Sequence, residues 1–405
     1  METRLPQDLL GTPEGREAEA ILRSCVHCGF CNATCPTYRL LGDELDGPRG
    51  RIYLMKQMLE GRPVTAQTRL HLDRCLTCLN CETTCPSGVR YGRLLDIGRT
   101  MVEQRAPRSA WERLKRQAVR TGLTTPALFE PALKVGRWVR DWLPAPLKSH
   151  VPPAVQPCIR PDGAHARTML VLEGCVQPGL APEINVAAAR VLGRLGIRLI
   201  SAAGAGCCGA IDQHMAAAQA ARKAMRRNID AWWPHIQAGV EAIVLTASGC
   251  GSLVKEYGHH LRHDPDYRAK AARVSALARD LSEVLAREDL DGMRAPHSSR
   301  VAFHPPCSLQ HGQQIRGVVE DILARAGFEL VPFAEPHLCC GSAGTYALLQ
   351  PELSHTLRER KLGHIQAARP GIIATANLGC RMHLAAGTDV PVVHWISLLE
   401  NAASQ

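Results

Sequence analysis

Short apolar runs rich in Val, Ile and Leu alternate with longer amphipathic runs over the second half of the chain. The apolar runs, such as "TMLVLEGC" at 168–175 and "VAFHPPC" at 301–307, have the length of buried strands. The amphipathic runs, such as "EINVAAARVLGRLG" at 183–196 and "VVEDILARAG" at 318–327, place apolar residues at helical spacing. This alternation predicts parallel βαβ units with right-handed crossovers.

The same half of the chain contains an internal repeat marked by cysteines. In each unit a single cysteine follows an apolar run, a Cys-Cys-Gly triplet comes next, and a further cysteine follows another apolar run. Because ligands bind beyond the carboxyl ends of parallel strands, we expect the thiols of each unit to gather there. They are Cys175, Cys207, Cys208 and Cys250 in the first unit, and Cys307, Cys339, Cys340 and Cys380 in the second.

The composition of the chain limits the classes of protein to which it can belong. Hydrophobic residues make up 45% of the 405 residues, which is enough for a sizeable core divided among domains. The first residues carry charges where a signal peptide needs an apolar stretch, and no later run reaches the roughly 18 apolar residues of a membrane span. We therefore expect a cytoplasmic protein whose 17 cysteines are metal ligands or redox centres rather than disulfides.

A basic connector precedes the repeat. Residues 102–167 hold 12 Lys or Arg against 5 Asp or Glu. This excess of 12 − 5 = +7 is most of the net charge of +10. Helical patterns at 111–119 and 133–143 lead into a Pro-rich stretch that also contains Cys158, which we expect to be unligated. The connector is either a solvated linker or a contact for an acidic partner or the inner face of the cell membrane. Nucleic acid is not an expected partner.

The most specific chemical signal lies near the N-terminus. "CVHCGFCNATCP" at 25–36 and "CLTCLNCETTCP" at 75–86 both have the C-x2-C-x2-C-x3-C-P spacing of bacterial ferredoxins. In this arrangement three thiolates on a tight loop hold three corners of a [4Fe-4S] cube, and the fourth cysteine reaches the other cluster. Zinc also binds C-x2-C pairs, but two complete copies with the terminal proline favour iron-sulfur clusters. The predicted ligands are Cys25, Cys28, Cys31 and Cys85 for cluster 1, and Cys75, Cys78, Cys81 and Cys35 for cluster 2.

These patterns predict a mixed α+β and α/β fold in four segments. A helical two-cluster ferredoxin-like domain at 1–101 is followed by the basic helical and Pro-rich connector at 102–167. Two α/β cysteine-rich domains with the Cys-Cys-Gly triplets occupy 168–296 and 297–405. Two adjacent clusters without an obvious substrate pocket favour electron relay, and we assign no catalytic residue.

The thiols of the repeat are weaker candidates for metal ligands. Four soft thiolates per unit suit a further iron-sulfur or zinc site, whereas free cysteine is also a common apolar core residue. Two Cys-Cys-Gly turns at matching positions favour the metal or redox role, because packing alone does not explain them. Histidines near these loops stay unassigned, because a lone histidine is more often structural; they are His304, His337, His383 and His394.

A glycine-rich turn in the first unit introduces the alternative of a dinucleotide site. Gly204, Gly206 and Gly209 match G-x-G-x-x-G between a strand and a helix. The second unit keeps Cys-Cys-Gly at this point but has Pro336 and Leu338 in place of the first two glycines. We therefore interpret the match as accidental and the first two glycines as dispensable. No flavin or nicotinamide is expected on this chain.

With these motifs placed, the sequence resembles the iron-sulfur subunit of bacterial glycolate oxidase, or glycolate dehydrogenase, over nearly its whole length. The matching stretches include "CVHCGFCNATCPTYRLLGDELDGPRGRIYL", "RRNIDAWWP" and "HLCCGSAGTYAL". The resemblance implies cysteine-rich domains of the type found in heterodisulfide reductase subunits. It also implies flavin-binding partner subunits that oxidise glycolate to glyoxylate, with this chain relaying electrons to a quinone or other acceptor.

The chain departs from the wider cysteine-rich family at the end of each unit. Leu253 and His383 stand where that family often has the last cysteine of a C-x-x-C pair, so a five-cysteine cluster is not implied.

Two alternatives remain beside the leading interpretation of the function. One is the iron-sulfur subunit of a related lactate or glycerol 3-phosphate dehydrogenase. The other is a heterodisulfide-reductase-like subunit that is itself catalytic.

Overall fold

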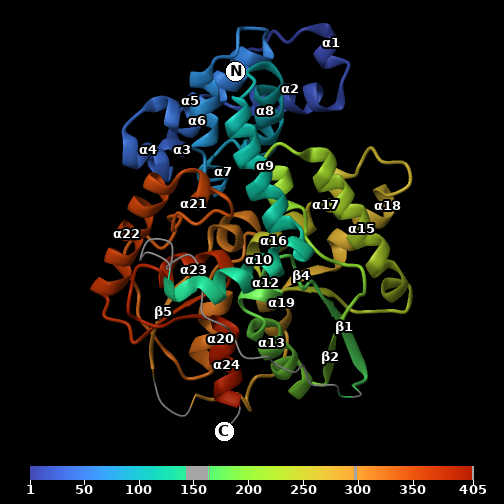
Figure 1. Cartoon of the computed structure of the whole chain (residues 1–405), viewed down its shortest axis with the longest axis vertical. Coiled ribbons are helices and arrows are strands. Elements are labelled where there is room, and N and C mark those ends of the chain that lie inside the picture. The colour runs from blue at the N-terminus through green and yellow to red at the C-terminus, as the bar shows by residue number, and fades with distance from the viewer. Residues whose placement is uncertain (143–162, 164, 296–298, 404–405) are drawn as a thin grey trace.

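The computed structural model describes residues 1–142, 163, 165–295 and 299–403. In Figure 1 the N-terminal helices lie at one end of the molecule, above two α/β units that stand side by side. The C-terminus lies at the opposite end. Most of the Pro-rich stretch of the connector, together with Cys158 and the prediction made for it, lies outside the described residues.

The N-terminal part is entirely helical. Its helices are α1 (Gln7–Leu10), α2 (Pro13–Ser24), α3 (Phe30–Ala33), α4 (Pro36–Leu41), η1 (Glu44–Asp46), α5 (Pro48–Leu59), α6 (Ala66–Asp73), α7 (Asn80–Thr84) and α8 (Tyr91–Arg105). Proline occupies the first turn of α2, α4 and α5, where its missing N–H leaves no hydrogen bond unmade. The apolar faces of these helices bury Leu22, Met55 and Leu94 in one core.

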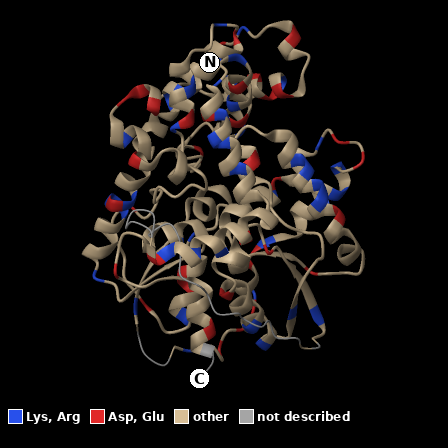
Figure 2. Cartoon of the chain, viewed as in Figure 1, with Lys and Arg blue, Asp and Glu red and all other residues tan. Residues whose placement is uncertain are grey.

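The connector forms the two helices that the sequence predicts. They are α9 (Ala110–Thr124) and α10 (Pro126–Val139), followed by η2 (Arg140–Trp142). Its basic side chains are partly neutralised within the chain, since Arg108 pairs with Asp73 at 2.7 Å and Arg120 lies 3.6 Å from Asp212. Figure 2 likewise shows Lys and Arg interleaved with Asp and Glu over the molecule rather than gathered on the connector.

Each α/β unit is built on a four-stranded parallel sheet. The first has the order β2-β1-β3-β4 and the second the order β6-β5-β7-β8, so the two units share one topology. This identity confirms the internal repeat. The strands are β1 (Arg167–Val171), β2 (Ile197–Ser201), β3 (Ile243–Leu245), β4 (Ala278–Asp280), β5 (Arg300–His304), β6 (Glu329–Leu330), β7 (Ile372–Thr375) and β8 (Val392–His394).

Helices connect and cover these strands. In the first unit they are α12 (Gln177–Leu180), α13 (Glu183–Arg194), α14 (Ala210–His214), α15 (Ala218–Gln237), α16 (Ser248–Lys255), α17 (Tyr257–His260), α18 (Arg268–Leu277) and α19 (Leu281–Leu285). In the second unit they are η3 (Ser308–Gly312), α20 (Val318–Arg325), α21 (Tyr346–Leu349), α22 (Pro351–Ala367), α23 (Leu378–Ala385) and α24 (Trp395–Ala403).

The two units share a hydrophobic core. Leu192 of α13, Phe303 of β5 and Trp395 of α24 belong to a single buried cluster that spans both sheets.

The predicted fold class, a helical ferredoxin-like part followed by a tandem α/β repeat, is confirmed. Within the described residues no helix combines the length and apolarity needed to cross a bilayer.

Candidate iron-sulfur sites

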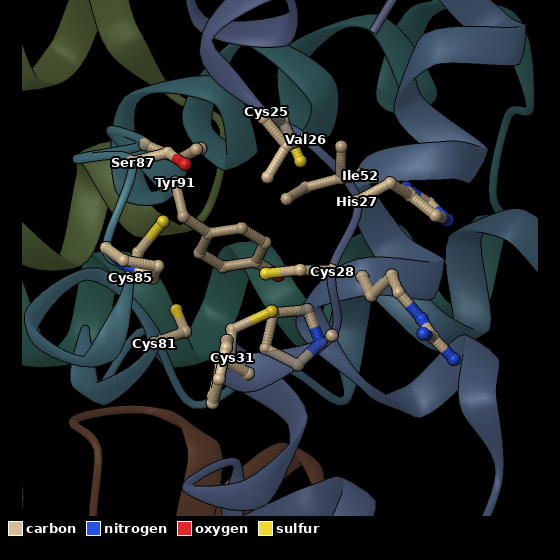
Figure 3. A pocket seen from close by; sticks show the side chains of 16 residues that line it. Cys25, Val26, His27, Cys28, Cys31, Ile52, Cys81, Cys85, Ser87 and Tyr91 are labelled. Carbon is tan, nitrogen blue, oxygen red and sulfur yellow. The ribbon is translucent and has the colours of Figure 1, made fainter.

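Five cysteines from the two ferredoxin-type motifs, among them the four assigned to cluster 1, line one pocket of the N-terminal part (Figure 3). Cys25, Cys28 and Cys31 come from the segment between the end of α2 and the first turn of α3. Cys85 comes from the second motif, at the end of α7. The structure thus brings together the four cysteines that the sequence assigns to cluster 1. Cys28 is exposed, so this thiol group reaches the molecular surface.

The loop that carries the first three thiols depends on two residues in the left-handed conformation. His27 has a φ of 58° and Gly29 a φ of 87°, and between them they turn the chain tightly enough for its thiols to line one pocket. In the second motif Thr77 and Leu79 take the same conformation, with φ of 55° and 59°. His27, Thr77 and Leu79 are not glycines, so the left-handed conformation strains their backbone. This strain indicates that the loop shape is required.

The first thiol group has the electrostatics of a cation site. Burial, together with the nearby thiolate of Cys25, raises the pKa of Cys31 to about 12, and burial also raises the pKa of Cys25. Thiolates gathered in a medium of low dielectric repel one another, so bound positive charge is needed to keep them ionised. The iron ions of a [4Fe-4S] cluster would supply that charge, and this donor set therefore fits the group.

The second thiol group lies deeper. Cys75 and Cys78 lie between α6 and α7, Cys81 lies in the first turn of α7, and Cys35 caps the start of α4. Burial raises the pKa of Cys81 well above its usual value, and the thiolates of the other three cysteines of this group raise it further. The structure therefore also brings together the four cysteines assigned to cluster 2. Cys81 in addition lines the pocket of the first group, so the two groups are neighbours.

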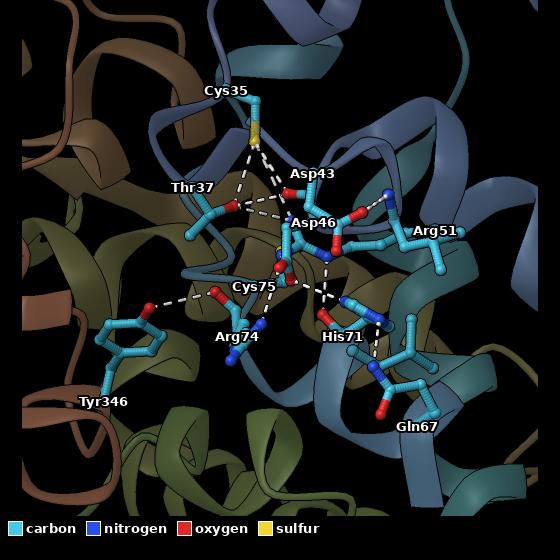
Figure 4. A network of polar contacts seen from close by, with 12 residues as sticks. Cys35, Thr37, Asp43, Asp46, Arg51, Gln67, His71, Arg74, Cys75 and Tyr346 are labelled. Carbon is cyan, nitrogen blue, oxygen red and sulfur yellow. Dashed lines mark hydrogen bonds and ion pairs between the residues drawn. The ribbon is translucent and has the colours of Figure 1, made fainter. Parts of the chain in front are cut away.

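A buried polar network surrounds the second group (Figure 4). The Asp46 carboxylate is fully buried and accepts hydrogen bonds from Arg51 at 3.4 Å and from Arg74 at 2.8 Å. His71 Nδ1 lies 3.0 Å from the same carboxylate. The Arg51 guanidinium also donates to Cys35 Sγ at 3.9 Å, which brings a buried positive charge to a ligand of the second group. Such charge favours the reduced, more negative state of a cluster.

Cys75 receives direct support from its neighbours. The Tyr91 hydroxyl donates to Cys75 Sγ at 3.5 Å, and the Thr77 backbone N–H does so at the same distance. Burial opposes ionisation of this thiol, yet the guanidinium groups of Arg51 and Arg99 outweigh it and lower its pKa. The sequence motifs did not reveal these supporting residues, because Arg51 and Tyr91 lie on helices outside the cysteine runs and follow no spacing rule.

The thiols of the α/β repeat lie beyond the carboxyl ends of strands, as predicted. Cys175 and Cys307 follow β1 and β5, whereas Cys250 and Cys380 lie on the helices that follow β3 and β7. Cys307 Sγ is 3.8 Å from Cys339 Sγ, and in both units each thiol contacts the next one of the four along the chain.

The glycine after each cysteine pair turns the chain. Gly209 has a φ of 94° and Gly341 a φ of 96°, so both turn the chain in the left-handed conformation directly after the two thiols. The interpretation of Gly204 as dispensable is wrong, because it has a φ of 90° and a side chain there would be strained. A dinucleotide turn also needs an acidic residue at the end of a second strand about twenty residues on, and Asp230 lies within helix α15 instead.

The second thiol group lies against the second α/β unit. Cys78 and Cys307 pack around one apolar cluster that contains Cys339 and Tyr346. Asn80 beside Cys81 donates to the backbone oxygen of His337 at 3.2 Å, so the contact also involves a polar link. After burial, the Cys307 thiolate is the main cause of the raised pKa of Cys78. The second thiol group therefore lies between the first group and the thiols of the second unit.

Comparison with known protein families agrees with the division between the N-terminal thiol groups and the α/β repeat. The family described as "4Fe-4S dicluster domain" matches residues 21–89, and the family described as "Cysteine-rich domain" matches residues 169–255 and 301–385. The fold and the thiol groups thus define an iron-sulfur protein in which a dicluster domain is joined to two cysteine-rich domains.

Relatives along the whole chain identify the family. The glycolate oxidase iron-sulfur subunit of Escherichia coli (strain K12) is 52% identical over 403 residues, which are 99% of each chain. The probable glycolate oxidase iron-sulfur subunit of Bacillus subtilis (strain 168) is 28% identical, over 96% of this chain and 95% of its own. The chain belongs to the family of glycolate oxidase iron-sulfur subunits.

One further relative and one solved structure are less similar to this chain. Lactate utilization protein A of Geobacillus kaustophilus is 27% identical over 54% of this chain and 92% of its own length. Among solved structures, a hypothetical protein from Helicobacter pylori has a TM-score of 0.54 at 10% identity, covering 97% of this chain and 72% of its own. That likeness concerns the fold alone.

Proposed function

We propose that this chain is the electron-transferring subunit of a complex that oxidises glycolate to glyoxylate. A flavin subunit would take two electrons from glycolate, and this chain would receive them singly. Cys25, Cys28, Cys31 and Cys85 hold one [4Fe-4S] cluster, and Cys75, Cys78, Cys81 and Cys35 hold the other. The observation that carries the proposal is the exchange of Cys35 and Cys85 between the two groups, which a two-cluster ferredoxin requires and separate zinc sites do not.

The order of the groups suggests a direction for the relay. The first group opens to the surface at Cys28, where Val26 and Phe30 are 68% and 64% exposed. Large apolar side chains exposed beside a redox centre suit a docking face for a partner protein. We infer that the flavin subunit docks here and that electrons pass inward to the second group.

The electrons then leave past the thiols of the second α/β unit towards a quinone or other acceptor. The thiols of both units offer a further iron-sulfur or zinc site on the way. With a quinone as acceptor, the complex would work in the cytoplasm, in peripheral contact with the inner face of the cell membrane. Flotation of the full chain with anionic vesicles at low and high salt tests that contact, since an electrostatic attachment weakens as salt rises.

The test of the cluster assignment is a set of single Cys-to-Ser variants of the full chain, purified anaerobically. The unaltered chain should hold about eight N-terminal irons, shown by paramagnetic resonance as two interacting clusters. Cys28→Ser and Cys85→Ser should disturb the same cluster, and Cys78→Ser and Cys35→Ser the other. If Cys85→Ser disturbed the cluster altered by Cys78→Ser, the assignment would be wrong. A tightly bound flavin on the isolated chain would contradict the relay.

A second candidate keeps the relay and changes the substrate. The likeness to lactate utilization protein A favours a complex that oxidises lactate, and a glycerol 3-phosphate complex is the third member of this class. The assembled complex should bleach its clusters when it is mixed with its own substrate. Glycolate, lactate and glycerol 3-phosphate are therefore compared at equal concentration, and faster bleaching by either of the latter two would reject glycolate.

A further inference from the structure

His304 is a buried histidine with unused donor and acceptor capacity. It lies at the end of β5, is 1% exposed, and neither ring nitrogen has a hydrogen-bond partner among the described residues. Thr375, its register partner on β7, is fully buried, and its hydroxyl likewise has no partner within the described part of the chain. Buried polar atoms left in this state cost about 1–3 kcal/mol each, so their presence calls for an explanation.

Two thiols of the second unit lie directly beside this imidazole. A ring nitrogen of His304, the Sγ of Cys340 and the Sγ of Cys380 all lie within 4.8 Å of one another. Cys340 and Cys380 are 1% and 4% exposed, so the three donors face a common interior space. They come from three separate elements, which are the end of β5, the Cys-Cys-Gly turn and the first turn of α23.

We propose that His304, Cys340 and Cys380 form a mixed imidazole and thiolate site for a single divalent ion of the zinc and ferrous class. Neutral imidazole and thiolate are the ligands that these ions share, and tetrahedral zinc with bonds of about 2.3 Å to sulfur spaces its ligands about 3.8 Å apart. The bound ion uses a nitrogen of His304. A water on the ion would give the Thr375 hydroxyl its missing partner.

The spacing of these donors distinguishes them from the ferredoxin-type groups. In the described part of the chain, the sets of three such donors found within 4.8 Å include none of the eight N-terminal cysteines. A four-iron cube spreads its ligands because each binds a different corner, whereas one ion draws its ligands close together. The tight set of the second unit therefore suits one ion.

The other tight set among the described residues has a different explanation. It consists of Asp43, Asp46 and His71. Its central carboxylate, Asp46, already accepts hydrogen bonds from Arg51 and Arg74, so positive charge within the chain satisfies it. His304 has no such neighbour within hydrogen-bonding distance in the described structure.

The first α/β unit provides an internal comparison. Leu172 lies three residues before Cys175, as His304 lies three residues before Cys307, and Leu172 is 4% exposed. The first unit therefore presents only thiols at the corresponding place. His383, which stands where the wider family has its last cysteine, is already engaged, since its Nε2 lies 3.3 Å from both the hydroxyl and the backbone oxygen of Ser354. The nitrogen ligand thus comes from β5 and not from α23.

The first variant to test is His304→Leu in the full chain, because leucine is the residue that the first unit buries at this place. His383→Gln is the matched control, since it alters the other histidine beside the Cys-Cys-Gly turn. Both are purified anaerobically with the unaltered chain. Zinc is measured by metal analysis and by absorption spectroscopy at the zinc edge. A single ferrous ion is sought by Mössbauer spectroscopy, which separates high-spin ferrous iron from the iron of the clusters.

The unaltered chain and His383→Gln should show zinc with one imidazole nitrogen, or a single ferrous ion, and His304→Leu should lose about one such metal ion per chain. An unaltered chain that holds neither ion, or a His304→Leu variant that keeps its ion, would overturn the site. If His304→Leu does not fold, His304→Cys replaces it and should keep the ion with sulfur in place of nitrogen. The inference does not rest on glycolate oxidation. Loss of the N-terminal cluster signals would bear on the proposed function and leave this site unaffected.

Discussion

The hydrogen bond from Tyr91 to Cys75 should tune the reduction potential of the second cluster. Tyr91 is 3% exposed and its hydroxyl donates to Cys75 Sγ at 3.5 Å. Burial, with the adjacent thiolate of Cys75, raises the pKa of Tyr91 well above its usual value, so the phenol stays protonated and remains a donor. Tyr91→Phe removes this donor and keeps the ring that fills the core.

The magnitude follows from the change in charge on reduction. A hydrogen bond to an ionised acceptor contributes about 1.5–3 kcal/mol. The added electron spreads over four irons and their ligands, so this one hydrogen bond should stabilise the reduced cluster over the oxidised cluster by only about 0.5–1 kcal/mol. At about 59 mV per tenfold change and about 1.36 kcal/mol per tenfold change, the potential should fall by roughly 20–45 mV. The fall is expected because the lost donor stabilises the more negative reduced cluster.

The assay is an anaerobic redox titration of the full chain, followed by paramagnetic resonance. Tyr257→Phe is the matched control, because Tyr257 is also buried but its hydroxyl donates to the backbone oxygen of Cys208 rather than to a ligand of the second cluster. It should leave both potentials unchanged. An unchanged or raised potential of the second cluster in Tyr91→Phe, in a chain with its full iron content, would refute the reasoning.

Three further predictions concern stability. Asp46→Asn should lower the free energy of unfolding in urea by about 3–5 kcal/mol, since Arg51 would keep a buried charge without its partner; a loss below 1 kcal/mol would contradict this. Gly341→Ala should cost more than about 2 kcal/mol, because φ is 96° and the new Cβ would lie 2.5 Å from a backbone oxygen, whereas Gly363→Ala in open helix should cost nothing. Burial lowers the pKa of His394 to about 3. The unfolded chain therefore binds the proton first as pH falls below about 6.5, and about 2 kcal/mol should be lost between pH 7 and 5. His394→Gln should remove this contribution of His394 to the loss of stability. Urea midpoints that shift equally between pH 7 and 5 in the unaltered chain and in His394→Gln would exclude the contribution.

Cysteine spacing made much of the site predictable. The two ferredoxin-type runs specify a local loop, so the motif alone was enough to group Cys25, Cys28 and Cys31. The exchange of Cys35 and Cys85 also followed, because that motif has a fixed division of ligands between clusters. The sequence does not indicate a role for His304, because a single histidine near a cysteine gives no sign of what faces it after folding.

The alternation of strand and helix, the repeat and the two thiol motifs can all be predicted from the sequence. These are local properties, which depend on side-chain periodicity and on the spacing of residues along one loop. Only the folded chain shows that Arg51 reaches Cys35, that Cys78 lies beside Cys307, and that His304 meets Cys340. Those contacts join distant segments, and packing of the whole chain sets them. Neutralisation of the basic connector by Asp73 has the same origin.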